Sequence, residues 1–189
     1  MGFTRAELDS FRDATVPDLL GDGLRLLFVG INPGLWTAAT STHFAHPGNR
    51  FYPALLLAGI IDRQIDRGGG MTAADREHVI SRGIGISNIV RRATAKASEL
   101  TAAELREGSL ELAQLIRLRR PAVVAVAGIT AYRTAFARPG AVMGLQPDSL
   151  EGAQLWVVPN PSGLNAHETT DTLAAAYRGP AIAAGVITA

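Results

Sequence analysis

Short apolar segments alternate along this chain with longer segments that have helical periodicity. The apolar runs span residues 24–29, 122–127 and 155–158, and a weaker one spans 84–90. Runs of this length without polar alternation are typical of strands buried on both faces of a parallel sheet. With helices between them, they predict an α/β fold in three layers, in which helices cover both faces of a short and mostly parallel central sheet.

Helices are predicted where capping patterns precede apolar residues at helical spacing. Thr4 with Glu7, and Thr101 with Glu104, have the Ser/Thr-x-x-Glu spacing of a capping box. Helices are therefore expected over 4–13, 50–61, 72–82, 101–120, 130–137 and 168–178, with a loop or small hairpin over 138–153 and a weakly specified tail from 183. Because no repeat or linker divides the chain, one domain is expected over residues 1–189.

The composition excludes several classes of protein. The 189 residues include 18 basic and 17 acidic ones, so a polybasic nucleic-acid binder is excluded but a local basic patch is not. Cysteine is absent and the four histidines lack the paired spacing of metal ligands, so we expect neither a metal nor a cofactor. We find no secretory signal and no run near the roughly 20 apolar residues that span a bilayer. The expectation is a cytoplasmic monomer that does not enter membranes.

Two Asn-Pro turns follow predicted strands, at 30–34 (Gly-Ile-Asn-Pro-Gly) and at 160–164 (Asn-Pro-Ser-Gly-Leu). Ligands of parallel sheets bind at the carboxyl ends of the strands, where both turns lie. The first turn lacks the lysine of a Walker loop and the third glycine of a dinucleotide fingerprint. It is either a plain turn or a loop that offers backbone N–H groups and one amide to a flat polar ligand.

Leu164 is a bulky apolar residue in a loop of small polar ones. One interpretation is that it folds back into the core. The other is that it stands out as an apolar wedge, which proteins insert between base steps of DNA.

Together and in this order, the two turns resemble the motifs of the mismatch-specific uracil/thymine-DNA glycosylase family, a branch of the uracil-DNA glycosylase superfamily. Residues 44–52 are similar to its pocket segment, 83–92 to its middle motif, and 104–121 to the helix that follows. The resemblance runs from about residue 16 to 178. Where members often carry Arg or Ser after the wedge leucine, this chain has Asn165, Ala166 and His167, and Asn88 stands where some carry Lys.

The resemblance implies a monofunctional DNA glycosylase that hydrolyses the N-glycosidic bond of uracil in double-stranded DNA with G·U or G·T mismatches. Thymine and other damaged bases are further candidate substrates, and the product is an abasic site. Asn32 would orient the attacking water through its side-chain carbonyl, because an amide does not titrate near neutral pH. Ser87 would support the same water, unless it only caps a short helix.

The flipped base is expected to bind at the end of the first strand. Backbone groups of Gly30, Ile31 and Phe44 would pair with its polar edge, and donors at O2 would stabilise the departing anion. Phe44 would stack on the ring unless it is a core residue. Pro33 belongs to the same motif, and Gly128 would border the pocket.

The second turn is expected to bind DNA, through Asn160, Ser162, Gly163, Leu164, Asn165 and His167. Gly163 to Asn165 would fill the gap left by the flipped nucleotide and pair with the widowed guanine. Ser162 would contact a phosphate, and His167 is either a second phosphate contact or a surface residue.

Two alternatives remain open. One is a broad glycosylase for alkylated bases with little preference for uracil. The other, from a different class, is a non-catalytic α/β module that binds damaged DNA or nucleotides. Asn32 and Leu164 argue against the second, since a small-nucleotide binder needs neither a water-orienting amide nor an apolar wedge.

Overall fold

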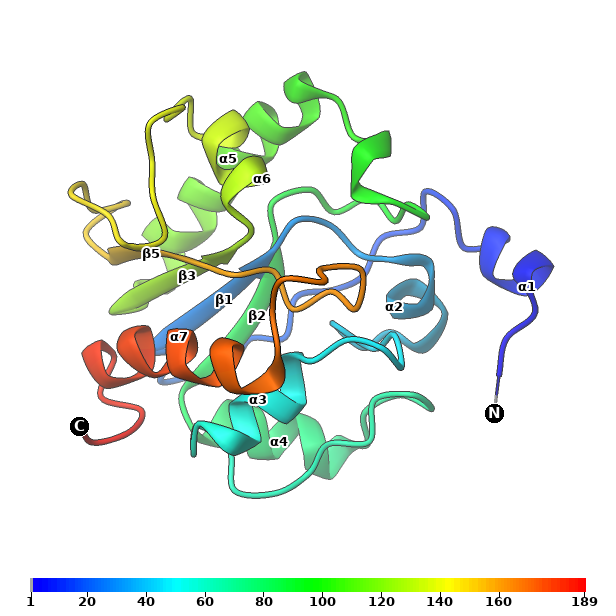
Figure 1. Cartoon of the computed structure of the whole chain (residues 1–189), viewed down its shortest axis with the longest axis horizontal. Helices are drawn as coiled ribbons and strands as arrows, with labels where there is room; N and C mark the ends of the chain where they lie inside the picture. Colours follow the sequence, from blue (N-terminus) through cyan, green and yellow to red (C-terminus); the bar gives the residue numbers. More distant parts are fainter. Residues whose placement is uncertain (1) are drawn as a thin grey trace.

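The computed structural model describes residues 2–189 and is built around a five-stranded sheet in the order β2-β1-β3-β5-β4 (Figure 1). The parallel strands are β1 (Leu26–Gly30), β2 (Ile84–Asn88), β3 (Val123–Ala127) and β5 (Gln154–Val158), and the short β4 (Gly144–Leu145) pairs antiparallel at one edge. The predicted α/β fold with a mostly parallel sheet is confirmed. Gly30 lies opposite Asn88, and Ala127 lies opposite Val158, so the strand ends meet at one edge.

Helices cover both faces of this sheet, with α3, α4 and α7 on one side and α5 and α6 on the other (Figure 1). Their bounds are α1 Arg5–Asp9, α2 Leu35–Thr40, α3 Phe51–Leu57, α4 Ala73–Ser81, α5 Ala102–Arg119, α6 Ile129–Ala135 and α7 Thr170–Ala183, with a 3-10 turn at Ala97–Glu99. Both predicted capping boxes are present, and in each the threonine hydroxyl accepts the backbone N–H of the glutamate. No helix among these residues is long and apolar enough to cross a membrane.

The core lies in two layers, one on each face of the sheet. In β1, Leu26 and Phe28 pack toward α3 and α7, and Leu27 and Val29 pack toward α5 and α6. All five residues of β1, β2 and β3 are buried, which explains why these strands show no polar alternation in the sequence.

Four helices differ from the sequence prediction. The helix α2 was not predicted, and α1 and α3 each end four residues before the expected Asp13 and Ile61. The helix α7 continues through Pro180, whose carbonyl accepts the backbone N–H of Ala184. A proline inside a helix costs stability, but here Gly179 packs directly against the ring of Trp156, where a Cβ would lie 2.8 Å from Cζ3. Tertiary packing therefore extends this helix beyond its local preference.

Candidate active site at the carboxyl end of the sheet

Asn32 follows β1 in a turn that holds its side chain in one orientation. Its Nδ2 lies within hydrogen-bond distance of the Arg92 carbonyl (2.9 Å), the Thr94 hydroxyl (2.7 Å) and the Pro33 carbonyl (3.2 Å). These acceptors take up the donor side of the amide. Among residues 2–189, Oδ1 has no hydrogen-bond partner, so the turn presents an oriented acceptor. Sequence reasoning did not identify Thr94, which is buried and in turn donates to the Lys96 carbonyl.

The Arg92 segment that anchors this amide is itself fixed by charge. The Arg92 guanidinium donates to Asp13 (2.8 Å) and to Glu104 (2.9 Å) at the start of α5. Hydrogen bonds from the Thr101 backbone and from Arg92 lower the pKa of Glu104 to about 2. These two ion pairs fix the Arg92 segment, so its backbone carbonyl stays within hydrogen-bond distance of the Asn32 amide.

Phe44 and Asn88 approach each other over Gly30. A Cβ on Gly30 would lie 2.6 Å from Asn88 Oδ1 and 3.3 Å from Phe44 Cζ, so any larger residue here must displace at least one of these two side chains. The half-buried Phe44 ring stacks on Phe51 with centroids 4.1 Å apart, and its backbone adopts a left-handed φ of 55°. Phe51 is 1% exposed and gives the Phe44 ring a fixed support.

Asn88 was not predicted as a site residue, and neither was His43. Asn88 Nδ2 lies 3.2 Å from Nδ1 of His43, and both side chains are buried. Burial lowers the pKa of His43 from its usual 6.5. The only sequence signal was the position of Asn88 at the end of a strand beside Gly30.

Ser87 lies on the other face of the sheet. Its hydroxyl donates to Asp18 (2.8 Å), which also pairs with Arg91 (2.9 Å), while the neighbouring Asn88 faces Gly30. Successive side chains of a strand point to opposite faces. The structure thus does not bring Ser87 to Asn32, and the predicted support of the water by Ser87 receives no help from this geometry.

Gly128 lies where the ends of β1, β3 and β5 meet. It has a φ of 114°, its N–H donates to the Val158 carbonyl, and a Cβ would lie 3.4 Å from Ile31 and 3.7 Å from Asn160. Pro33, in the turn after β1, is buried. Within residues 2–189, the backbone N–H groups of Ile31 and Phe44 donate to no protein acceptor, so both remain available to a ligand.

The second turn projects Leu164 into solvent. Leu164 is 87% exposed, more than any other large apolar side chain among residues 2–189, so the interpretation as a core leucine is wrong. The polar residues of this turn hold its shape. Asn160 Oδ1 accepts the N–H of Ser162 (3.0 Å), Ser162 Oγ accepts the N–H of Leu164 (3.3 Å), and Asn165 Nδ2 donates to the Asn160 carbonyl (3.1 Å).

Arg50, which sequence reasoning missed, attaches this loop to the segment before α3. Its backbone N–H donates to the Pro161 carbonyl, and its Nη1 donates to the carbonyls of Glu168 (2.8 Å) and Asn165 (3.2 Å). Gly163 packs against Gly48, whose carbonyl oxygen would lie 2.6 Å from an added Cβ. Leu164 is thus carried by a braced loop, and His167 is exposed beside it.

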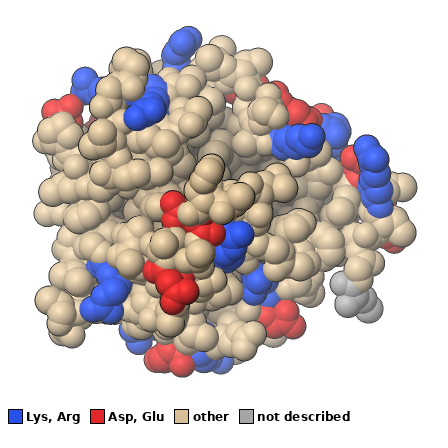
Figure 2. Space-filling view, in the orientation of Figure 1, with Lys and Arg blue, Asp and Glu red and all other residues tan. Residues whose placement is uncertain are grey.

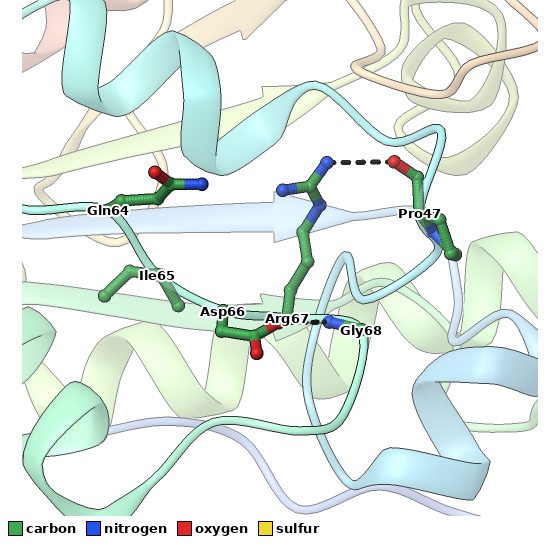
Figure 3. A pocket seen from close by; sticks show the side chains of 6 residues that line it. All are labelled: Pro47, Gln64, Ile65, Asp66, Arg67 and Gly68. Carbon is green, nitrogen blue, oxygen red and sulfur yellow. Dashed lines mark hydrogen bonds between the residues drawn. The ribbon is translucent and has the colours of Figure 1, made fainter. Parts of the chain in front are cut away.

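Two surface hollows lie around the loop that contains Gln64, Ile65 and Arg67. One, of about 430 Å³, is lined by Pro47 and residues 64–68, and Arg67 Nη2 donates across it to the Pro47 carbonyl at 2.9 Å (Figure 3). The other, of about 370 Å³, is more apolar and extends to α3 and Thr170. Neither is lined by Asn32 or Phe44. Basic and acidic side chains are interspersed over the face shown in Figure 2, without a continuous basic patch.

The family model for the uracil DNA glycosylase superfamily matches residues 17–179. The chain belongs to this superfamily. Its fold is similar to a solution structure from Methanosarcina acetivorans that is provisionally designated a uracil DNA glycosylase, with a TM-score of 0.62 and 16% identity over 92% of this chain and 98% of that one. At 16% identity, this similarity establishes that the two proteins share a fold. Membership of the superfamily supports a glycosylase function in the repair of uracil in DNA, and DNA as the partner.

Proposed function

We propose that this protein removes uracil from mismatched double-stranded DNA by hydrolysing its N-glycosidic bond and leaves an abasic site. The observation that carries the proposal is the anchored amide of Asn32, whose three acceptors on Nδ2 leave Oδ1 as a fixed acceptor at the strand end. A water bound to this oxygen would be oriented toward the sugar carbon C1′. Because the amide is not a strong base, catalysis then depends on stabilising the departing base, which predicts slow turnover.

The target base must leave the helix before this water can reach it. Leu164, fully presented by a loop that Arg50 braces, is suited to enter the stack and occupy the vacated space. Holding the loop rigid lowers the entropy lost on insertion, so more of the apolar contact is available to offset unstacking.

The extruded base would bind where Phe44 and Asn88 meet over Gly30. Phe44 supplies a ring backed by Phe51, and base–aromatic stacking contributes roughly 1–3 kcal/mol. The Asn88 amide can accept from N3–H of uracil and donate to O4. The free N–H groups of Ile31 and Phe44 are donors suited to stabilise negative charge on O2 as the bond breaks.

The preference for mismatches is assigned to the loop that carries the wedge. Gly163 and Asn165 flank Leu164, so their backbone groups would face the orphaned guanine when the wedge is inserted. A wobble pair also costs less to open than a normal pair, which favours G·U and G·T over A·U.

Release of base from labelled duplexes, followed by alkali cleavage, tests this proposal. Wild-type protein and Asn32→Ala are compared on G·U, A·U, G·T, single-stranded and alkylated-base substrates, and binding to the same duplexes is measured in parallel. We expect cleavage in the order G·U, then G·T and A·U, with the Asn32→Ala variant nearly inactive. Equal cleavage of alkylated bases and uracil would favour a broad glycosylase instead. No cleavage together with tight binding to damaged duplex would support the non-catalytic module.

A further inference from the structure

A chain of hydrogen bonds links the backbone of Pro17, at the surface, to two buried side chains, His43 and Asn88. Nε2 of His43 lies 3.0 Å from the Pro17 carbonyl, and Nδ1 lies 3.2 Å from Asn88 Nδ2. A carbonyl oxygen only accepts, so Nε2 must carry a proton. In the neutral ring Nδ1 is then unprotonated and can only accept, which requires the nitrogen of Asn88 to face it.

The surroundings of this chain leave it little freedom to rearrange. Next to Pro17, the segment pairs with the outer edge of β2 through Leu19, which exchanges two backbone hydrogen bonds with Ile86 (2.9 and 2.8 Å). The Tyr52 hydroxyl donates to the His43 carbonyl at 3.0 Å. His43 is 4% exposed and Asn88 is 9% exposed, so water cannot easily replace a lost partner.

The orientation of the Asn88 amide determines which base edge it matches. With Nδ2 toward His43, Oδ1 lies against Gly30 beside Phe44, on the side proposed to receive the base. Uracil offers a donor at N3 and an acceptor at O4, whereas cytosine offers an acceptor at N3 and a donor at N4. An amide locked in this orientation complements uracil, and cytosine would need it reversed.

We propose that His43 is a positioning residue that locks the Asn88 amide for uracil and thereby excludes cytosine from the site. This inference rests on the proposed function. It also implies that protonation of Nδ1 releases the lock, because an N–H would then face the N–H of Asn88. The amide must turn or the ring must move, and uracil loses its match.

The groups around His43 determine the pH at which the Asn88 amide is released. Burial lowers its pKa, and the Arg76 guanidinium acts in the same direction, while the Pro17 hydrogen bond and the Asp18 carboxylate oppose the shift. The Tyr52 hydroxyl stays neutral because burial raises its pKa. His43 is therefore neutral at neutral pH and keeps the Asn88 amide in place. It becomes protonated, and releases the amide, only at a pH below 6.5, the usual pKa of histidine.

The tautomer of His43 can be measured without any activity. A long-range ¹H–¹⁵N spectrum of the imidazole nitrogens in the free protein at pH 8, assigned by loss of signals in His43→Phe, should show a protonated Nε2 and an unprotonated Nδ1. A proton on Nδ1 at this pH would overturn the lock.

Activity tests the consequence, with uracil and cytosine each placed opposite thymine so that both are mispaired. His43→Phe removes the acceptor, and we expect the ratio of uracil to cytosine release at pH 8 to fall by at least about tenfold. His43→Asn keeps an oxygen near the Nδ1 position but does not titrate, so it should retain the ratio and lose the acid decline of the wild type.

Unchanged ratios in His43→Phe, or an acid decline that persists in His43→Asn, would refute the role of His43. If the wild type releases no uracil, the proposed function fails, whereas the imidazole spectrum still tests the lock. A melting temperature measured for each variant separates loss of the lock from loss of fold.

Discussion

Replacing Gly30 with alanine should disable base release while leaving the fold intact. The added Cβ would lie 2.6 Å from Asn88 Oδ1 and 3.3 Å from the Phe44 ring, whereas real Cβ contacts essentially never fall under 3.0 Å. The amide must move away, but it is buried and tied to His43 at 3.2 Å. Alanine at this position therefore disturbs both the stacking ring and the polar group proposed to read the base.

The expected magnitudes follow from the overlap. Forcing one extra methyl into a packed site costs about 1–3 kcal/mol, which lowers the melting temperature by roughly 2–12 °C in a protein of this size. A displaced amide leaves the base edge unpaired, and a loss of about 1–3 kcal/mol in the transition state reduces release by about five- to 150-fold.

Single-turnover release from a G·U duplex and thermal unfolding measure the two effects. Gly34→Ala is the matched control in the same turn, because a Cβ there meets nothing within 4 Å. In the double variant Gly30→Ala/Asn88→Ala, the worst overlap is gone, so part of the melting temperature should return while release stays low. If Gly30→Ala keeps both the activity and the melting temperature of the wild type, the proposed base site is misplaced.

Further predictions concern the water, the wedge, the buried histidine and metals. Asn32→Ala should nearly abolish release while G·U binding persists, and Asn32→Asp should retain part of the activity; wild-type single-turnover rates in Asn32→Ala would contradict the assignment. Leu164→Ala should impair release from A·U more than from G·U and least from single strands, measured at one salt concentration, whereas equal losses would indicate a packing role. Because burial lowers the pKa of His43, the unfolded chain binds a proton that the folded chain does not, so the free energy of unfolding should fall as pH drops below 6.5. When this free energy is measured by urea denaturation between about pH 5 and 8, it should change less steeply with pH in His43→Phe than in the wild type. EDTA should leave activity unchanged, and inactivation reversed by one specific ion would show a metal requirement.

The sequence by itself determined the fold class and the position of the two turns that form the candidate site. Apolar runs that end at Gly30 and Val158 predicted a parallel sheet, and the turns after them lie at the carboxyl ends of β1 and β5, as expected. The capping boxes predicted the starts of α1 and α5, because a capping interaction is complete within four residues. Such local chemistry can be read directly from the order of residues.

The tertiary structure decided which side chains face the site. A strand buried on both faces carries no alternation, so nothing in the sequence shows whether Ser87 or Asn88 points toward Phe44. Two of the three acceptors that orient Asn32 lie 60 and 62 residues away, and His43 is 45 residues from Asn88. Hydrogen bonds over such separations exist only once the sheet has assembled, because they depend on packing between elements and not on local pattern.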